Sequence, residues 1–356
     1  MQISTFKVFL TLVFASFFSM AFASSNDSDQ EEKPFNTTEL IFHHINDSYS
    51  FHVAGDITIP LPVILWTDNG LVSFMSSEFH HDVEGRTIVE KKGLRFVNAH
   101  EKIYQLEPGA SAVEMNVEGH PVNAHRPWDF SITKNVFSMF LSMVIIFLLF
   151  ATAARSYKKS DNRMPKGIGK FMEPIIVFIR DEIAIPNIGE HAYKKYMPFL
   201  LTLFFFIWVN NIFGLIPFFP FGSNLSGNIS FTLALAVVTF VIMIFSSKGQ
   251  YWKHMLWMPG LPIPMKLFLA PIELLGMFVK PIALMIRLFA NITAGHVIVL
   301  SLISLIFILN TIWVSPASVI FVVFISVIEV LVVAIQAYIF TLLSALYFGQ
   351  ALESEH

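Results

Sequence analysis

One arginine interrupts an apolar stretch of this sequence, Pro281-Ile282-Ala283-Leu284-Met285-Ile286-Arg287-Leu288-Phe289-Ala290-Asn291. The guanidinium group stays charged at physiological pH, and placing that charge at membrane depth costs at least about 2.5–3.5 kcal/mol. Ionisable residues within membrane-spanning segments are rare for this reason, and most of them are functional. Arg287 is therefore the first candidate for a functional residue.

The composition indicates an integral membrane protein. Of the 356 residues, 54% are hydrophobic and only 14% are charged, whereas a soluble domain averages about 25% charged residues. The sequence has no cysteine, which excludes disulfides, thiolate catalysis and cysteine-ligated metals. It also has no Gly-x-x-x-x-Gly-Lys-Ser/Thr phosphate loop, so we do not expect an enzyme that acts on ATP.

The first 23 residues are predicted to be a secretory signal peptide. Lys7 precedes the apolar segment Val8–Phe22, and Ala21-Phe22-Ala23 forms a small-residue cleavage site. An uncleaved membrane anchor is the alternative. In either case residues 24–130 are expected to be exported. This segment carries 17 acidic and 7 basic side chains, whereas the rest of the chain is net basic.

Residues 24–130 are predicted to form a small β-rich exported domain. Asp56–Trp66 and Gly93–Val97 are short apolar or alternating runs, and Asp68-Asn69-Gly70 supplies turn residues. Eight of the twelve histidines lie in this part, including the pairs His43-His44 and His80-His81. Their spacing matches no standard metal-ligand pattern, so we expect solvated surface histidines and no metal site.

Residues 131–356 are predicted to form an all-α polytopic membrane domain with about five transmembrane helices. The first three spans are Val136–Ala154, Pro198–Phe218 and Ile229–Phe245. A basic cluster after the first span predicts that its carboxyl end is cytoplasmic. The segment Phe171–Ile185 is too polar to span, and we expect it to lie at the interface or to pack on other helices.

The last two spans are longer than a bilayer requires. Met265–Asn310 contains 46 residues, about 69 Å of helix, whereas the hydrocarbon core is about 30 Å thick. We therefore expect this segment to be broken, strongly tilted, or both, and Pro271, Gly276 and Pro281 offer break points. Pro316–Phe348 is a second overlong span.

Polar side chains recur within these two overlong spans, namely Glu273, Lys280, Arg287, Asn291, His296, Glu329 and Gln336. At 100° per residue Lys280, Arg287 and Asn291 share one helix face, and Glu273 joins them if the helix is unbroken. His296 falls on the opposite face and is expected to approach Glu329, which shares a stripe with Gln336. Buried ion pairs that join helices are the alternative. Histidine and glutamate can exchange protons near neutral pH, whereas arginine cannot, and this combination predicts a guarded proton path.

Three motifs, in this order, resemble subunit a of the bacterial and mitochondrial F-type ATP synthases, and the resemblance covers residues 131–356. They are Asn211-Ile212-Phe213-Gly214-Leu215-Ile216-Pro217 with Asn224-Leu225-Ser226, then Lys280-Pro281 with Arg287-Leu288-Phe289-Ala290-Asn291-Ile292-Thr293-Ala294-Gly295-His296, and finally Gln336-Ala337-Tyr338-Ile339-Phe340-Thr341-Leu342-Leu343.

The resemblance implies a stator subunit beside a rotating ring of c subunits. It implies that Arg287 faces the ring carboxylate between two offset aqueous half-channels and blocks direct proton leakage. The residues implied to line or support the proton path are Asn291, His296, Glu329, Gln336 and Glu273. The implied partners are the c-ring, the b subunits of the peripheral stalk, the lipid bilayer and, indirectly, the F1 sector, with no cofactor and no nucleic acid. The implied location is the bacterial inner membrane, with a periplasmic amino-terminal domain and a cytoplasmic carboxyl terminus.

The sequence departs from the commonest bacterial pattern at three positions. Ala290 replaces a glycine, while His296 and Glu329 exchange the two residue types that many bacterial members carry there, as mitochondrial members do. The added domain, residues 24–130, is expected to pack near the periplasmic mouth of the entry channel. A secondary transporter is the main rival, but it predicts an internal repeat that the sequence lacks. A membrane protease would need a nucleophile–base pair or a zinc helix, and neither occurs.

Overall fold

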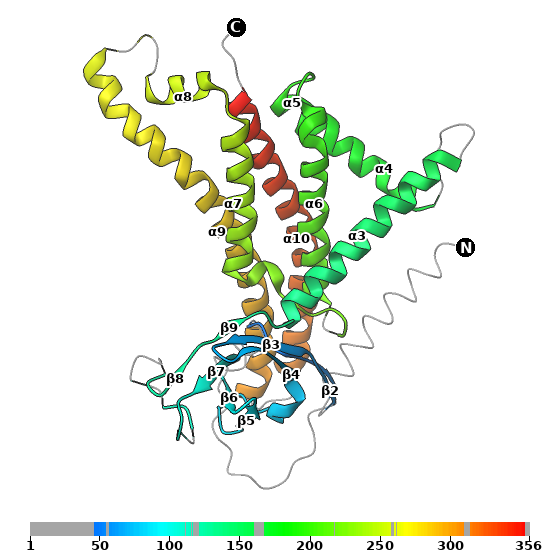
Figure 1. The fold of residues 1–356 in the computed structure, drawn as a ribbon. Helices are drawn as coiled ribbons and strands as arrows, with labels where there is room; N and C mark the ends of the chain where they lie inside the picture. Colours follow the sequence, from blue (N-terminus) through cyan, green and yellow to red (C-terminus); the bar gives the residue numbers. More distant parts are fainter. Residues whose placement is uncertain are drawn as a thin grey trace, which may run out of the picture.

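The computed structural model describes residues 46–54, 57–110, 112–114, 116, 121–159, 167–216, 218–257, 260, 262–309 and 314–352. The predicted signal peptide, residues 1–23, lies outside these residues, as do His43 and His44. A small β domain precedes a set of long helices, and it lies at one end of them (Figure 1).

The β domain contains nine strands within the described residues, and all of their pairings are antiparallel. They are β1 (Ser50–Ala54), β2 (Ile57–Pro60), β3 (Pro62–Thr67), β4 (Gly70–Met75), β5 (Val89–Lys91), β6 (Leu94–Ala99), β7 (Lys102–Leu106), β8 (Ala124–His125) and β9 (Trp128–Asp129). Three sheets have the strand orders β1-β2, β4-β3-β9 and β5-β6-β7-β8. The predicted turn joins β3 to β4, where Thr67 pairs with Gly70. The prediction of a β-rich domain is therefore confirmed.

Alternation along the strands gives this domain its own core. Val63 and Leu65 of β3 are fully buried, while the next residue after them, Trp66, is exposed. Phe74, Phe79 and Phe96 complete the core in tilted and edge contacts with centroids 5.5–5.8 Å apart. A period-two pattern places these apolar side chains on one face of each strand.

Five helices are long and apolar enough to cross a bilayer, as predicted. They are α3 (Lys134–Lys159), α6 (Tyr193–Leu215), α7 (Ile229–Ser246), α9 (Ile263–Leu309) and α10 (Val314–Leu352). The polar segment after α3 forms α4 (Ile168–Phe178), a π-helical turn η2 (Ile179–Ala184) and α5 (Ile185–Ile188). Ile179, Ile183 and Ala184 are fully buried, so this segment packs on the spanning helices.

The longest helix, α9, runs unbroken through both of its prolines. It contains 47 residues with Pro271 and Pro281 inside it, so it is about 70 Å long at 1.5 Å per residue. The expected break does not occur, since α9 is one continuous helix, and it runs obliquely past α7 in Figure 1. Because the helix is continuous, Glu273 stays in register with Lys280 and Arg287.

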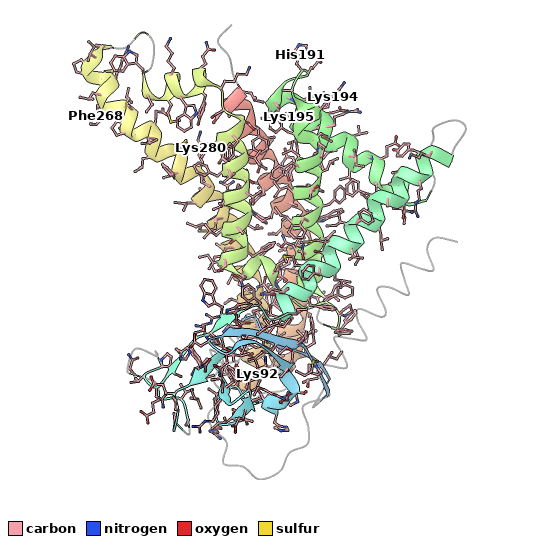
Figure 2. The ribbon with its side chains drawn as sticks, viewed as in Figure 1. Lys92, His191, Lys194, Lys195, Phe268 and Lys280 are labelled. Atoms are coloured by element: carbon pink, nitrogen blue, oxygen red, sulfur yellow. The ribbon has the colours of Figure 1, made fainter. Side chains whose placement is uncertain are left out.

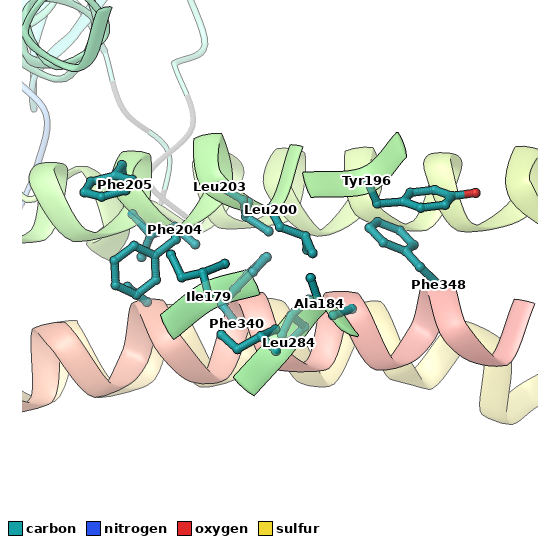
Figure 3. Close-up of a cluster of buried hydrophobic side chains, with 14 of the residues drawn as sticks. Ile179, Ala184, Tyr196, Leu200, Leu203, Phe204, Phe205, Leu284, Phe340 and Phe348 are labelled. Atoms are coloured by element: carbon teal, nitrogen blue, oxygen red, sulfur yellow. The ribbon is translucent and has the colours of Figure 1, made fainter. Parts of the chain in front are cut away.

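The membrane core forms where α6, α10 and the π-helical turn meet (Figure 3). The Tyr196 ring stacks on Phe348 with centroids 5.1 Å apart. Gly349 then allows α5 to approach α10, because a β-carbon at this position would overlap the carbonyl oxygen of Asn187. The carboxyl end of α10 is thus fixed against the first half of the domain.

The β domain is attached to the amino-terminal end of α3 and to the loop that follows α6. The Phe51 ring contacts Phe137 of α3 and Phe219 in the loop after α6, with centroids 5.4 and 5.3 Å apart. The Lys134 N–H at the start of α3 donates to the Ser48 carbonyl oxygen at 2.9 Å. The added domain therefore caps one end of the membrane domain. Lys194 and Lys195 lie at the opposite end (Figure 2).

Candidate functional site

The two overlong helices are joined along a polar seam. The Asn291 Nδ2 atom of α9 donates to the Gln336 Oε1 atom of α10 at 2.8 Å. Nearer the end opposite the β domain, the Lys280 ammonium donates to Gln350 Oε1 at 2.8 Å and lies 5.5 Å from the Tyr347 ring centroid. Gln336 is 1% exposed, so its bond to Asn291 fixes the register of α9 and α10 in the bilayer.

Arg287 lies on the open side of this seam. Its side chain is exposed, as is that of Glu273 two turns beyond Lys280. Its nearest neighbours on the helix surface, Ala283 and Ala290, are apolar and also exposed. Tyr347 of α10 is close enough to interact electrostatically with Arg287, but no carboxylate of the described residues forms an ion pair with it. An exposed permanent charge is costly in a membrane unless another chain supplies the counter-charge.

Glu329 approaches α9 closely at Gly295. A β-carbon at Gly295 would overlap the Glu329 carboxyl group, so the absence of a side chain there makes room for this acid. Glu329 and Gln336, seven residues apart, thus both face α9. Glu329 is half-buried between the two helices.

His296 points away from Glu329, towards α6. A β-carbon at Gly214 of α6 would lie 3.7 Å from His296 Nε2 and 3.3 Å from the Ser223 carbonyl oxygen. One helical residue turns the side chain by about 100°, so Gly295 faces Glu329 while His296 faces α6. The structure therefore differs from the expected direct contact: in the described residues no hydrogen bond joins the His296 ring to the Glu329 carboxyl group.

A group of buried polar side chains, which we call the outer polar cluster, surrounds the Ser223 side of Gly214. Its members are Asn135, Asn211, Ser223, Asn224 and Ser226, each 6% exposed or less. Ser223 Oγ donates to Asn135 Oδ1, and Ser226 Oγ donates to Asn211 Oδ1. The Nδ2 atoms of Asn211 and Asn224 have no acceptor among the described residues. Buried amides in an apolar bundle need hydrogen-bond partners, and water is the usual one.

Sequence reasoning assigned no role to this cluster. Asn211, Gly214, Asn224 and Ser226 lie in one of the three motifs, but their side chains come together only because the short helix η3 (Leu225–Gly227) inserts between α3, α6, α7 and α9. Asn135 is 88 residues away from its partner Ser223. A motif scan therefore finds part of the cluster, whereas its contact with Asn135 of α3 can be seen only in the three-dimensional structure.

A second polar site lies nearer the end of the helices that is opposite the β domain. A small cavity between α7, α9 and α10 is lined by Thr239, Lys280, Leu284 and Tyr347, together with Ala236, Phe240, Met243 and Pro281. Glu273 is close enough to Lys280 and Tyr251 to interact electrostatically. The described part of the chain thus has one polar region towards the β domain and another towards Lys280, with Arg287 between them along α9.

Five spans, two of them overlong, with a polar seam and an exposed arginine, define a polytopic membrane protein of the ion-conducting class. The family model for the ATP synthase A chain matches residues 136–349, well over half of the chain. The chain belongs to this family.

Similar proteins agree with this result. An ATP synthase subunit a from Chloroherpeton thalassium is 42% identical over 234 residues, covering 64% of this chain and 68% of the relative. One named ATP synthase subunit a 2, from Chlorobaculum tepidum, is 46% identical over 231 residues, covering 63% and 64%. One from an Anaeromyxobacter species is 39% identical over 274 residues, covering 74% and 65%. The chain thus spans about two thirds of the length of these relatives. A domain of unknown function matches residues 40–130.

Proposed function

We propose that this chain is the proton-conducting stator subunit of the membrane sector of an F-type ATP synthase. It holds two half-channels against a ring of c subunits and performs no chemistry on ATP itself. The observation that carries the proposal is the exposed Arg287 on the apolar open face of α9, because a neighbouring chain with an intramembrane carboxylate would supply its counter-charge.

The two polar regions supply the two half-channels. Protons enter through the outer polar cluster to His296 and pass to the Glu329 region, where Gly295 makes room for the carboxyl group. They leave past Glu273 and the cavity at Lys280. Asn291 and Gln336 hold α9 and α10 together beside Arg287, which prevents a direct connection between the two routes.

The exposed position of Arg287 favours this function over that of a solute transporter. A transporter would enclose a charged solute between repeated halves of the protein. Here the permanent charge is exposed on the outside of the helices, where it can meet another chain. The chain is a multi-pass protein of the bacterial inner membrane, with the β domain on the periplasmic side. The b subunits of the peripheral stalk and, through them, the F1 sector are the further partners.

The decisive variant is Arg287→Ala. It is expected to abolish ATP-driven proton pumping in membrane vesicles while nucleotide hydrolysis by the detached soluble sector continues. The matched control is Arg155→Ala, which removes an exposed arginine near the end of α3 and should leave pumping unchanged. Pumping at the wild-type rate by the Arg287→Ala complex would refute the proposed role of this arginine.

The position of the β domain at the proposed entry supports a role there. Deleting residues 30–120 should reduce assembly or proton flow, because the deletion removes Phe51 from Phe137 and Phe219. ATP synthesis rates in vesicles measure this effect. Rates equal to those of the full chain would show that the added domain contributes nothing to proton entry.

A further inference from the structure

Two acidic residues of the β domain lie where this domain meets α3. The Asp47 Oδ1 atom accepts hydrogen bonds from the backbone N–H groups of Asn135 and Ser48, each at 3.0 Å. Lys134, at the start of α3, interacts electrostatically with both Asp47 and Glu101. Two carboxyl groups and one ammonium group therefore lie close enough to interact electrostatically at the junction of the two domains.

Glu101 is held at this junction by an unfavourable backbone. It lies in the two-residue turn between β6 and β7, where His100 and Glu101 have φ angles of 51° and 57°. Such turns favour Asn and Gly, because side chains on both central residues are strained at positive φ. This turn places the half-buried Glu101 side chain at the junction with α3.

The charged group continues directly into the outer polar cluster. Asn135, whose backbone bonds to Asp47, accepts a hydrogen bond at its side chain from Ser223 Oγ. The Ser223 carbonyl oxygen and His296 Nε2 then lie on the same side of Gly214. A water molecule could bridge the Ser223 carbonyl oxygen and His296 Nε2. The unpartnered Nδ2 atoms of Asn211 and Asn224 lie in the same cluster and offer donors to such water.

We propose that Asp47, Glu101 and Lys134 form a proton-collecting site, through which the added β domain supplies the mouth of the entry half-channel. The inference rests on the proposed function and deepens it. It names the residues that take protons from the outer solution and pass them, through water held at Asn135 and Ser223, to His296. When both acids are ionised the group carries one net negative charge, which attracts protons to it.

Burial of the two acids suits this role. Burial raises the pKa of Glu101 to about 7, although the Lys134 charge opposes the shift and the Asp47 charge adds to it. Burial likewise raises the pKa of Asp47, although its hydrogen bonds with Thr133, Asn135 and Ser48 and the Lys134 charge oppose the shift. The other titratable or charged groups at this junction are Tyr49 and Asp129, which hydrogen bond to each other, and Arg126, which interacts electrostatically with Tyr49. A carboxyl group that titrates near neutral pH both accepts and releases protons there.

The test measures passive proton conductance of vesicles stripped of the soluble sector, as a function of the pH on the side of the β domain. The double variant Asp47→Asn, Glu101→Gln should lower conductance at least about threefold at an outer pH of about 8, where protons are scarce, and much less at about 5.5. The matched control is Asp68→Asn, Glu90→Gln, which neutralises two exposed acids elsewhere in the β domain. Co-purification of the c-ring verifies assembly.

A conductance equal to that of the control at both pH values would overturn the proposal. If the double variant does not assemble, Glu101→Gln alone keeps the hairpin and the Asp47 bonds and should show the same pH-dependent loss, whereas an unchanged profile would refute the site. Failure of the proposed function gives a different result. In that case Arg287→Ala, made with an unchanged β domain, would leave the conductance unaltered.

Discussion

The two sides of α9 carry different kinds of polar chemistry. On the open side Arg287 is exposed among apolar residues and has a permanent charge. On the packed side His296 lies beside Gly214 and a cluster of buried amides and hydroxyls. The fixed charge thus faces the place where a partner chain would pass, and the titratable ring faces the polar interior. Under the proposed function, one helix would both guard and conduct, because its side chains project in different directions.

The largest effect on stability is expected at Gly349 of α10, where this helix packs on α5. In Gly349→Ala the new methyl group would overlap the Asn187 carbonyl oxygen, and backbone cannot move aside as a flexible side chain can. We expect a loss of about 3 kcal/mol, and poor assembly. The yield and thermal midpoint of the purified complex measure it.

The matched control for this prediction is Gly276→Ala. Nothing lies within 4 Å of a β-carbon at Gly276, near the open end of α9. The same change there should be neutral or stabilise by up to about 1 kcal/mol, because alanine favours helix. Equal losses at Gly349 and Gly276 would mean that the two regions of the helices do not differ in packing.

The next effect is expected where the seam is hydrogen-bonded. Gln336→Leu removes the acceptor of the Asn291 amide in a position that is 1% exposed. The loss should be about 2 kcal/mol, with slower proton flow, because the Asn291 amide is left without its acceptor in a membrane, where water does not replace it. The double variant Asn291→Leu, Gln336→Leu tests the bond itself: it should recover part of the stability, and additive losses from the two substitutions would contradict a direct interaction.

A smaller effect on stability, about 1 kcal/mol, is expected at Gly295. In Gly295→Ala the new methyl group meets the Glu329 carboxyl group, which is a flexible end that can move. The main result should be slower ATP-driven proton pumping with normal assembly, since the acid leaves its position beside α9. Pumping unaffected by this change would remove Glu329 from the proposed path.

An effect of similar size, which depends on pH, is expected at the domain junction. Because the pKa of Glu101 is raised in the folded protein to about 7, its contribution is present at acidic pH and is lost as pH rises through about 7. After discounting for solvent screening at this half-buried position, the loss is about 1 kcal/mol. Thermal unfolding at pH 5.5 and 8 should show a smaller difference for Glu101→Gln than for the wild type. An identical difference would exclude Glu101 as its source.

The sequence predicted the spans because their length and hydropathy follow directly from bilayer thickness. It also placed Glu329 and Gln336 on one stripe, which needs only helical periodicity. It left open whether α9 breaks at Pro271 and Pro281, because prolines inside long membrane helices permit both a kink and a continuous helix. The short helix α8 (Gly249–Leu256) was not predicted, since eight residues carry little periodic signal.

The direction of His296 was the main difference. Periodicity gave its face relative to Arg287 but could not say which helix lies there, and that helix is α6 rather than α10. The outer polar cluster was also beyond sequence reasoning, because it joins Asn135 to Ser223 across 88 residues. Tertiary packing, and not local pattern, brings these polar groups together.

Access of water to the two polar regions from opposite sides of the membrane tests the central claim most directly. Because the chain has no cysteine, Ser223→Cys reports on the outer polar cluster and Thr239→Cys on the cavity at Lys280. Silver ions, added to one side of sealed vesicles, should block proton flow through Ser223→Cys only from the side of the β domain. They should block flow through Thr239→Cys only from the opposite side. Block of Ser223→Cys from the side opposite the β domain, or of both variants from either side, would contradict two half-channels separated at Arg287.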